Sequence, residues 1–200
     1  MIPVLKNEFY CRTLMKDDIE YMEGLARFSG ENDVDSFLFY DALDLINQDR
    51  LITTGVFKRE TSKLVAFYTL TVESHIYNFE EDDTLSLAEK EQLRSFSLED
   101  LQRSVLSLKF LGVKEDERGK GIGTYIIDKI FRIARRVSTK QVFVEALLSA
   151  KEFYEKRNFE IVSSEDELIN ATSVLMVRII SPFETALISN SMDDCLKISS

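Results

Sequence analysis

The sequence predicts a single domain of the α/β or α+β class, and three observations support this. Segments with the apolar pattern of strands alternate along the chain with segments of helical periodicity. The chain has 200 residues, of which 44% are hydrophobic and 30% charged, a mixture that suits a globular protein with a sizeable core. Neither an internal repeat nor a linker divides it. We therefore expect one domain over 1–200, with a core at 8–181, an acidic insertion at 76–100 and a tail at 182–200.

Composition argues against several classes of protein. The chain carries 25 Lys and Arg against 35 Asp and Glu, and this net charge of -10 argues against a general binder of nucleic acid or anionic membranes. No apolar run approaches the ~18 residues of a membrane-spanning helix, and residues 1–10 lack the pattern of a secretory signal. Cys11 and Cys195 lie at opposite ends of the chain, without metal or redox spacing. We expect a reduced, cytoplasmic protein without a metal site, although a disulfide stays formally open.

The first half of the chain predicts a short mixed series of elements. A polar segment at 58–63 separates two β-rich runs and predicts a hairpin. Gly30 is expected to end the first helix, and Asp17 and Asp18 favour its start because carboxylates stabilise the positive end of the helix dipole. The elements expected, in order, are a strand at 8–14, helices at 16–28 and 34–47, and strands at 51–57 and 64–72.

The segment 77–100 has a weak periodic pattern and carries eight acidic side chains against two basic ones. We interpret it as an insertion with a helix near 85–93 and a solvated acidic surface. Beyond it the alternation becomes regular again. We expect strands at 104–113, 141–146, 159–162 and 173–180, helices from 123 to 137 and at 149–156, and a polar loop at 163–171.

A glycine-rich turn joins the strand that ends at Val113 to the next helix. Residues 118–123 read RGKGIG, with three glycines at alternate positions. Glycines allow unusual backbone angles and leave room for a ligand, so the N–H groups of the turn can converge with those of the helix N-terminus on a phosphate. Arg118 and Lys120 would add positive charge. The spacing fits neither the P-loop nor the dinucleotide fingerprint, and a sharp turn without a ligand is the alternative.

A second stretch, residues 149–159, reads SAKEFYEKRNF. By itself it also fits an amphipathic helix with a core aromatic pair. Together the two stretches resemble the GCN5-related N-acetyltransferase (GNAT) superfamily. The acetyl-CoA loop of that superfamily, Q/R-x-x-G-x-G/A, is matched by Arg118, Gly121 and Gly123. Its later segment, A-x-x-F-Y-x-x-x-G-F, is matched by Ala150, Phe153, Tyr154 and Phe159. Asn158 stands in place of the usual glycine and tolerates the left-handed backbone well. Residues 28–38 and 65–70 look more weakly like the toxin-type branch, some of whose members acetylate aminoacyl-tRNA.

The resemblance implies a mixed central sheet of about 6–7 strands flanked by helices. Its fourth and fifth strands, here 106–113 and 141–147, would splay apart. It also implies acetyl-CoA as co-substrate, with no metal. Gly112 is expected to mark a bulge or a close approach. The residues implied to bind the cofactor are Leu111, Gly112, Val113, Arg118, Gly119, Lys120, Gly121, Ile122, Gly123 and Thr124.

The resemblance implies direct transfer of the acetyl group to an amine. Tyr154 is the expected general acid that protonates the coenzyme A thiolate, although packing against the cofactor is the alternative. For the base, Glu145, Glu73 and His75 stay open, with Glu145 as our choice. Leu147 replaces an asparagine that many family members carry three residues before the alanine of the second motif.

The distribution of charge along the chain bears on the amine acceptor. Residues 114–157 carry 11 basic and 7 acidic side chains, so the negative charge concentrates elsewhere in the chain. Arg132, Arg135 and Arg136 either reach the 3′-phosphate of coenzyme A or form a solvated helix face. We expect a primary amine on a cationic small molecule or peptide. The alternatives are aminoacyl-tRNA, the one nucleic acid considered, and a coenzyme A-binding module without catalysis. A homodimer is a further expectation from the family.

Overall fold

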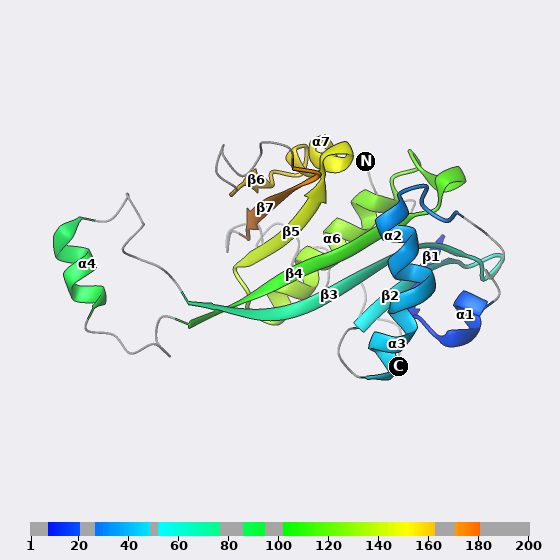
Figure 1. Ribbon diagram of the computed structural model, residues 1–200, viewed down its shortest axis with the longest axis horizontal. Coiled ribbons are helices and arrows are strands. Elements are labelled where there is room, and N and C mark those ends of the chain that lie inside the picture. The colour runs from blue at the N-terminus through cyan, green and yellow to red at the C-terminus, as the bar shows by residue number, and fades with distance from the viewer. Residues whose placement is uncertain are drawn as a thin grey trace, which may run out of the picture.

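The computed structural model describes residues 8–20, 27–48, 52–76, 86–94, 102–162 and 171–180. Its centre is a seven-stranded sheet with the order β1-β2-β3-β4-β5-β7-β6 (Figure 1). Neighbouring strands are antiparallel, except that β4 and β5 are parallel. The strands are β1 (Phe9–Thr13), β2 (Ile52–Lys58), β3 (Leu64–Ile76), β4 (Gln102–Val113), β5 (Gln141–Leu147), β6 (Glu160–Ile161) and β7 (Ser173–Ile179). The predicted mixed sheet is confirmed.

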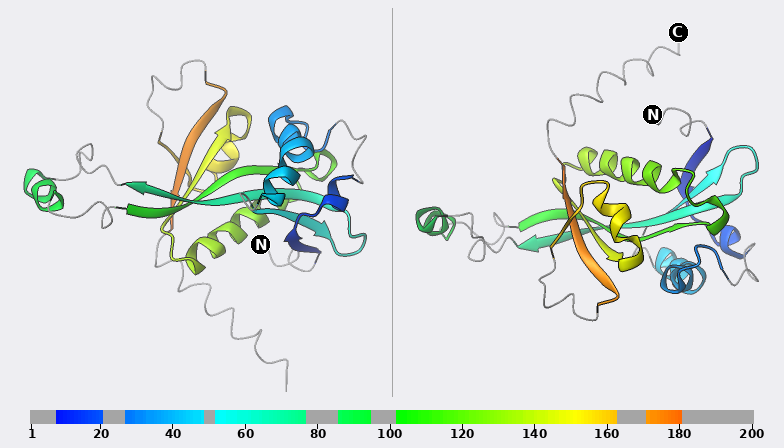
Figure 2. Two further views of the ribbon diagram at one scale, coloured as in Figure 1. Left: turned by 60° about the horizontal axis from the view of Figure 1, so that its bottom comes forward. Right: turned by 90° about the horizontal axis from the view of Figure 1, so that it is seen from above.

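Helices cover both faces of this sheet. Helix α6 lies against one face, and α2, η2 and α3 lie against the other (Figure 2). Helix α4 lies apart from them, beyond the ends of β3 and β4 (Figure 1). The helices are α1 (Lys16–Glu20), α2 (Asn32–Ser36), α3 (Ala42–Asn47), α4 (Leu87–Leu93), α6 (Ile122–Arg136) and α7 (Lys151–Glu155). The other helical segments are the π-helical turn η2 (Phe37–Asp41) and the 3-10 turns η4 (Glu115–Glu117) and η5 (Leu148–Ala150).

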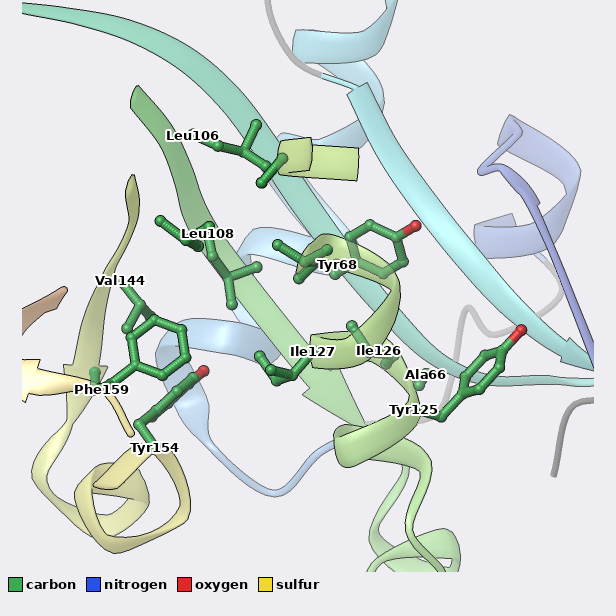
Figure 3. Close-up of a cluster of buried hydrophobic side chains, with 14 of the residues drawn as sticks. Ala66, Tyr68, Leu106, Leu108, Tyr125, Ile126, Ile127, Val144, Tyr154 and Phe159 are labelled. Carbon is green, nitrogen blue, oxygen red and sulfur yellow. The ribbon is translucent and has the colours of Figure 1, made fainter. Parts of the chain in front are cut away.

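The strands place alternate side chains in two separate cores. On β3, Ala66 and Tyr68 face α6, whereas Phe67 between them faces the other core. The first core contains Ile126 and Ile130 of α6. The second contains the buried residues of η2 and of the helices and strands that pack around it. Figure 3 shows part of the first core. These two cores hold the helices that border the site.

The predicted helix over 16–28 is wrong at its end, where Phe28 is in a turn and not in a helix. Residues 21–26 lie outside the described part of the chain. The carboxylate of buried Asp35 accepts hydrogen bonds from the backbone nitrogens of Phe28, Ser29 and Gly30, at 3.0, 2.7 and 3.1 Å. Because Asp35 accepts the hydrogen bonds of these N–H groups, they do not bond to the carbonyls of a helix. The helical spacing of the apolar residues could not indicate this. The proposed loop after 163, most of the acidic insertion and the tail from 182 also fall outside the described residues.

Strand β4 carries a bulge at Lys109. Thr69 of β3 pairs with Phe110, whereas the next residue, Leu70, pairs with Leu108, so Lys109 has no partner on β3. The pairing of β4 with β5 ends at the same place, since only Leu106–Leu108 pair with Val142–Val144. A bulge bends a strand and increases its twist. The predicted splay of these two strands therefore starts at Lys109.

Gly112 follows the bulge and serves close packing. A Cβ atom at this position would lie 2.5 Å from Cε1 of Phe67. Of the two expectations for Gly112, the close approach is confirmed, and the bulge lies three residues earlier.

Candidate active site

A cavity of 410 Å³ lies where β4 and β5 diverge, next to the glycine-rich turn. Of the residues predicted to bind the cofactor, Leu111, Val113, Arg118, Gly119, Gly121, Ile122, Gly123 and Thr124 line it. Gly112 and Lys120 belong to the same segments and are not part of the wall. The turn and the open strand end are thus brought together as one site, as the two motifs predicted.

The glycines of the turn have structural reasons to be glycine. Gly119 and Gly121 have φ values of +75° and +82°, which side-chain-bearing residues rarely adopt. Gly121 is the N-cap of α6, and the first helical bond runs from the nitrogen of Tyr125 to its carbonyl at 3.0 Å. The N–H groups of the three residues before Tyr125, which line the cavity, are therefore without helical partners. A Cβ on Gly123 would lie 2.9 Å from Phe153.

Two acidic side chains, Glu31 and Glu117, lie in this wall, and two lysines neutralise Glu117. Buried Glu117 accepts hydrogen bonds from Lys58 at 2.5 Å and from Lys120 at 2.9 Å, and these bonds, the one from Lys58 foremost, lower its pKa. Arg118 donates a hydrogen bond to the carbonyl of Ser29, in the turn that Asp35 holds. Both cations predicted from the glycine motif therefore also have structural partners within the site.

Arg157 is a site residue that the sequence interpretation missed. It lines the cavity, its guanidinium lies 3.7 Å from the ring centroid of Phe153, and it donates hydrogen bonds to the Thr124 hydroxyl and the Phe153 carbonyl. The signal was present, because Arg157 sits inside the second motif. The resemblance rested on Ala150, Phe153, Tyr154, Asn158 and Phe159, and no role was assigned to Arg157. In contrast, Arg132, Arg135 and Arg136 do not line the cavity.

A second cavity, of 290 Å³, shares Tyr154 with the first. Its wall includes the carboxylates Asp33 and Glu145 together with Lys109. The residues that line both cavities are Val34, Leu111, Leu147, Ala150 and Tyr154. The two cavities therefore meet at Tyr154, so that ligands entering from the two sides would come together there. Leu147, in place of the family's asparagine, gives this junction an apolar wall.

Tyr154 is held firmly at this junction. Its side chain is 5% exposed, and its ring makes edge contacts with Phe153 and Phe159, at centroid distances of 5.0 and 5.4 Å. In Figure 3 it extends from α7 beside Phe159, with its hydroxyl at the end away from the helix. Burial raises the pKa of Tyr154, and nearby Arg157 only partly opposes this. The phenol therefore keeps its proton across the physiological range.

The three candidate bases lie in different surroundings. Glu145 is exposed on β5 and accepts a hydrogen bond from the Ser173 hydroxyl at 2.6 Å. Glu73 lines neither of the two cavities. Burial alone would raise its pKa, but Lys109, Ser107 and Thr71 outweigh burial and lower the pKa to about 2. That makes Glu73 a weak base. The side chain of His75 lies outside the described part of the structure.

The described residues contain no group of three or more His, Cys, Asp or Glu side chains that could hold a metal ion. None of the described helices has both the length and the apolar character needed to cross a membrane.

A coenzyme A thioester fits the glycine-rich turn at 118–123 (the glycine cradle), the apolar wall beside Tyr154 and the diverging strands β4 and β5. Together these features define the protein as an acyltransferase. The sequence profile of the Acetyltransferase (GNAT) domain matches residues 58–161, and the chain belongs to this family of N-acetyltransferases. Acetyl-CoA is accordingly its co-substrate. Comparison with curated proteins found no match.

Several solved structures share the fold over most of the chain. A bacterial toxin is 18% identical with a TM-score of 0.67, covering 90% of this chain and 94% of its own. AtaTR bound with acetyl-CoA is 17% identical with a TM-score of 0.66, covering 90% and 98%. AtaT complexed with acetyl-methionyl-tRNAfMet is 16% identical with a TM-score of 0.57, covering 92% and 99%. The predicted likeness to toxin-type GNAT proteins is confirmed for the fold.

Proposed function

We propose that the protein transfers the acetyl group of acetyl-CoA directly to a primary amine, with Tyr154 as the general acid. The observation that carries this proposal is that Tyr154 lines both cavities. The 410 Å³ cavity, with the glycine cradle, suits the cofactor, and the 290 Å³ cavity suits the acceptor. The acetyl carbon would then lie at the junction, next to the phenol.

The proposed step conserves atoms and charge. The nitrogen of a neutral amine forms a bond to the acetyl carbon, and the bond from that carbon to sulfur breaks. Tyr154 gives its hydroxyl proton to the departing sulfur and regains a proton from solvent. The nitrogen gives up one proton, through water, to Glu145. The high pKa of Tyr154 suits this role because a phenol that stays protonated is ready to donate to a thiolate. Backbone N–H groups of β4 beyond the bulge would polarise the acetyl carbonyl.

Charge favours a cationic acceptor, either a small molecule or a peptide amine. Residues 28–48, which include the helices over the acceptor side, carry five carboxylates and no Lys or Arg. Asp33 and Glu145 lie in the wall of the acceptor cavity. Lys109 is also there, but its ammonium forms an ion pair with Glu73. An ammonium-bearing substrate would therefore meet a net negative entrance.

Aminoacyl-tRNA is the second candidate acceptor, and the fold it shares with AtaT complexed with acetyl-methionyl-tRNAfMet supports it. The α-amino group of an aminoacyl ester could enter the same cavity. The acidic segment 28–48 opposes this candidate, because binding the tRNA backbone requires Lys and Arg beside the site.

A coenzyme A-release screen separates these candidates. The panel contains polyamines, basic peptides, aminoglycosides, amino acids and charged tRNA. We expect release with cationic amines, and we expect Glu145→Gln to lower kcat, because the proton acceptor is lost, and to raise the KM for the amine. Glu160→Gln, which removes an exposed carboxylate outside both cavities, is the matched control and should leave that KM unchanged. Activity on charged tRNA alone would contradict the cationic acceptor. Binding of coenzyme A without release for any amine would contradict the proposed catalysis and favour a binding module.

A further inference from the structure

We infer that Arg157 binds the pyrophosphate of coenzyme A directly. This inference rests on the proposed function for one point, namely that coenzyme A occupies the 410 Å³ cavity. Nothing in the glycine motif points to Arg157, which reaches the same wall from the turn after α7. The structure brings its guanidinium to the first turn of α6, where a phosphate is expected.

Arg157 has unused hydrogen-bonding capacity. A guanidinium has five N–H donors. One Arg157 amino group donates to the Phe153 carbonyl and the other to the Thr124 hydroxyl. The Nε atom is buried and has no acceptor among the described residues. A buried donor without a partner is costly, so an incoming acceptor at this place would be stabilised.

Among the residues that the structure describes, no neighbouring carboxylate cancels the positive charge of Arg157. Within the described part of the chain, no carboxylate forms an ion pair with Arg157, whereas Lys120 is paired with Glu117. Asp128 acts on Arg157 only through space. Because Arg157 is partly buried and its charge is not cancelled by a contacting carboxylate, it exerts a strong attraction on a dianion in the cavity.

The guanidinium of Arg157 is held in a fixed orientation. Thr124 precedes the first hydrogen-bonded N–H of α6, so its side chain lies beside the helix N-terminus. The bond from Arg157 to the Thr124 hydroxyl therefore places the guanidinium next to the N–H groups at the start of α6. The Phe153 ring supports the guanidinium plane at 3.7 Å. A planar, pre-oriented guanidinium suits phosphate recognition better than a lysine does.

The test compares ligands that differ in their phosphates. Calorimetry measures the binding of coenzyme A and dephospho-coenzyme A, and ligand-observed NMR measures the binding of pantetheine. The proteins are wild type, Arg157→Gln, Arg157→Lys and the control Lys156→Gln, whose ammonium is exposed and paired with Glu152. We expect Arg157→Gln to weaken both nucleotide ligands equally, by about tenfold or more, and to leave pantetheine unchanged. Arg157→Lys should recover part of the loss, and Lys156→Gln should match wild type.

Two results would overturn the inference. An equal loss for pantetheine would show that Arg157 only maintains the shape of the site. A loss for coenzyme A but not for dephospho-coenzyme A would assign Arg157 to the 3′-phosphate. Failure of wild type to bind coenzyme A at all is a different result, because it would contradict the proposed function itself.

Discussion

Asp35 and Ser29 are joined by two hydrogen bonds, from the Ser29 backbone nitrogen at 2.7 Å and from its hydroxyl at 2.5 Å, both to Oδ1 of Asp35. The carbonyl of Ser29 in turn accepts a bond from Arg118. The nitrogen of Glu115 also donates to the carbonyl of Phe28, at 2.9 Å. The carboxylate of Asp35 on α2 thereby fixes a turn that is hydrogen-bonded both to Arg118 of the glycine-rich turn and to Glu115 at the start of η4.

The loss of this carboxylate should therefore destabilise the protein. Asp35→Ala leaves the backbone nitrogens of Phe28, Ser29 and Gly30 without their acceptor. Each buried unpaired group costs about 1–3 kcal/mol, and water will recover part of this, so we expect a loss of about 3 kcal/mol in total. Chemical denaturation measures it. Asp33→Ala, at an exposed position two residues earlier, should change the free energy of unfolding by less than about 0.5 kcal/mol. Equal effects of the two variants would show that Asp35 does not organise the turn.

Glu73 should make stability depend on pH in acid. Its pKa is lowered to about 2 from an ordinary value of 4.5, so its contribution is fully present above pH 4.5 and is lost as the pH falls toward 2. Because the side chain is 33% exposed, we expect a contribution of about 1 kcal/mol. Denaturation of wild type and Glu73→Gln between pH 2 and pH 7 measures the difference. It should be largest near neutrality and vanish at the acid end, and a difference independent of pH would contradict the ion pair with Lys109.

Two glycines should respond differently to alanine. Gly112→Ala places a Cβ atom 2.5 Å from the Phe67 ring, and this overpacking should cost about 1–3 kcal/mol. Gly119→Ala meets no atom within 4 Å, and its cost, about 1 kcal/mol, comes only from the φ of +75°. Thermal denaturation ranks the two variants. A larger loss at Gly119 would mean that the close packing of Gly112 is wrongly described.

Much of the fold and site could be predicted because the informative signals are local. The alternation of apolar residues located the strands, and the two motifs placed Tyr154 and the glycine turn in one site. What escaped prediction depends on partners distant in sequence. The bulge at Lys109 exists only in relation to β3, and the turn at Phe28 depends on the carboxylate of Asp35. Arg157 lies inside the second motif, but its contact with Thr124 of the first motif arises only on folding.

We propose that Tyr154 is the general acid. The most direct test measures the steady-state rate of coenzyme A release by wild type and by Tyr154→Phe with the same amine. The substitution removes one hydroxyl and preserves the ring contacts with Phe153 and Phe159. General acid catalysis contributes about 10²–10⁴-fold, so we expect kcat to fall by about that factor, with an almost unchanged KM for acetyl-CoA. An unchanged kcat, or a rise in KM alone, would contradict the account and make Tyr154 a packing residue.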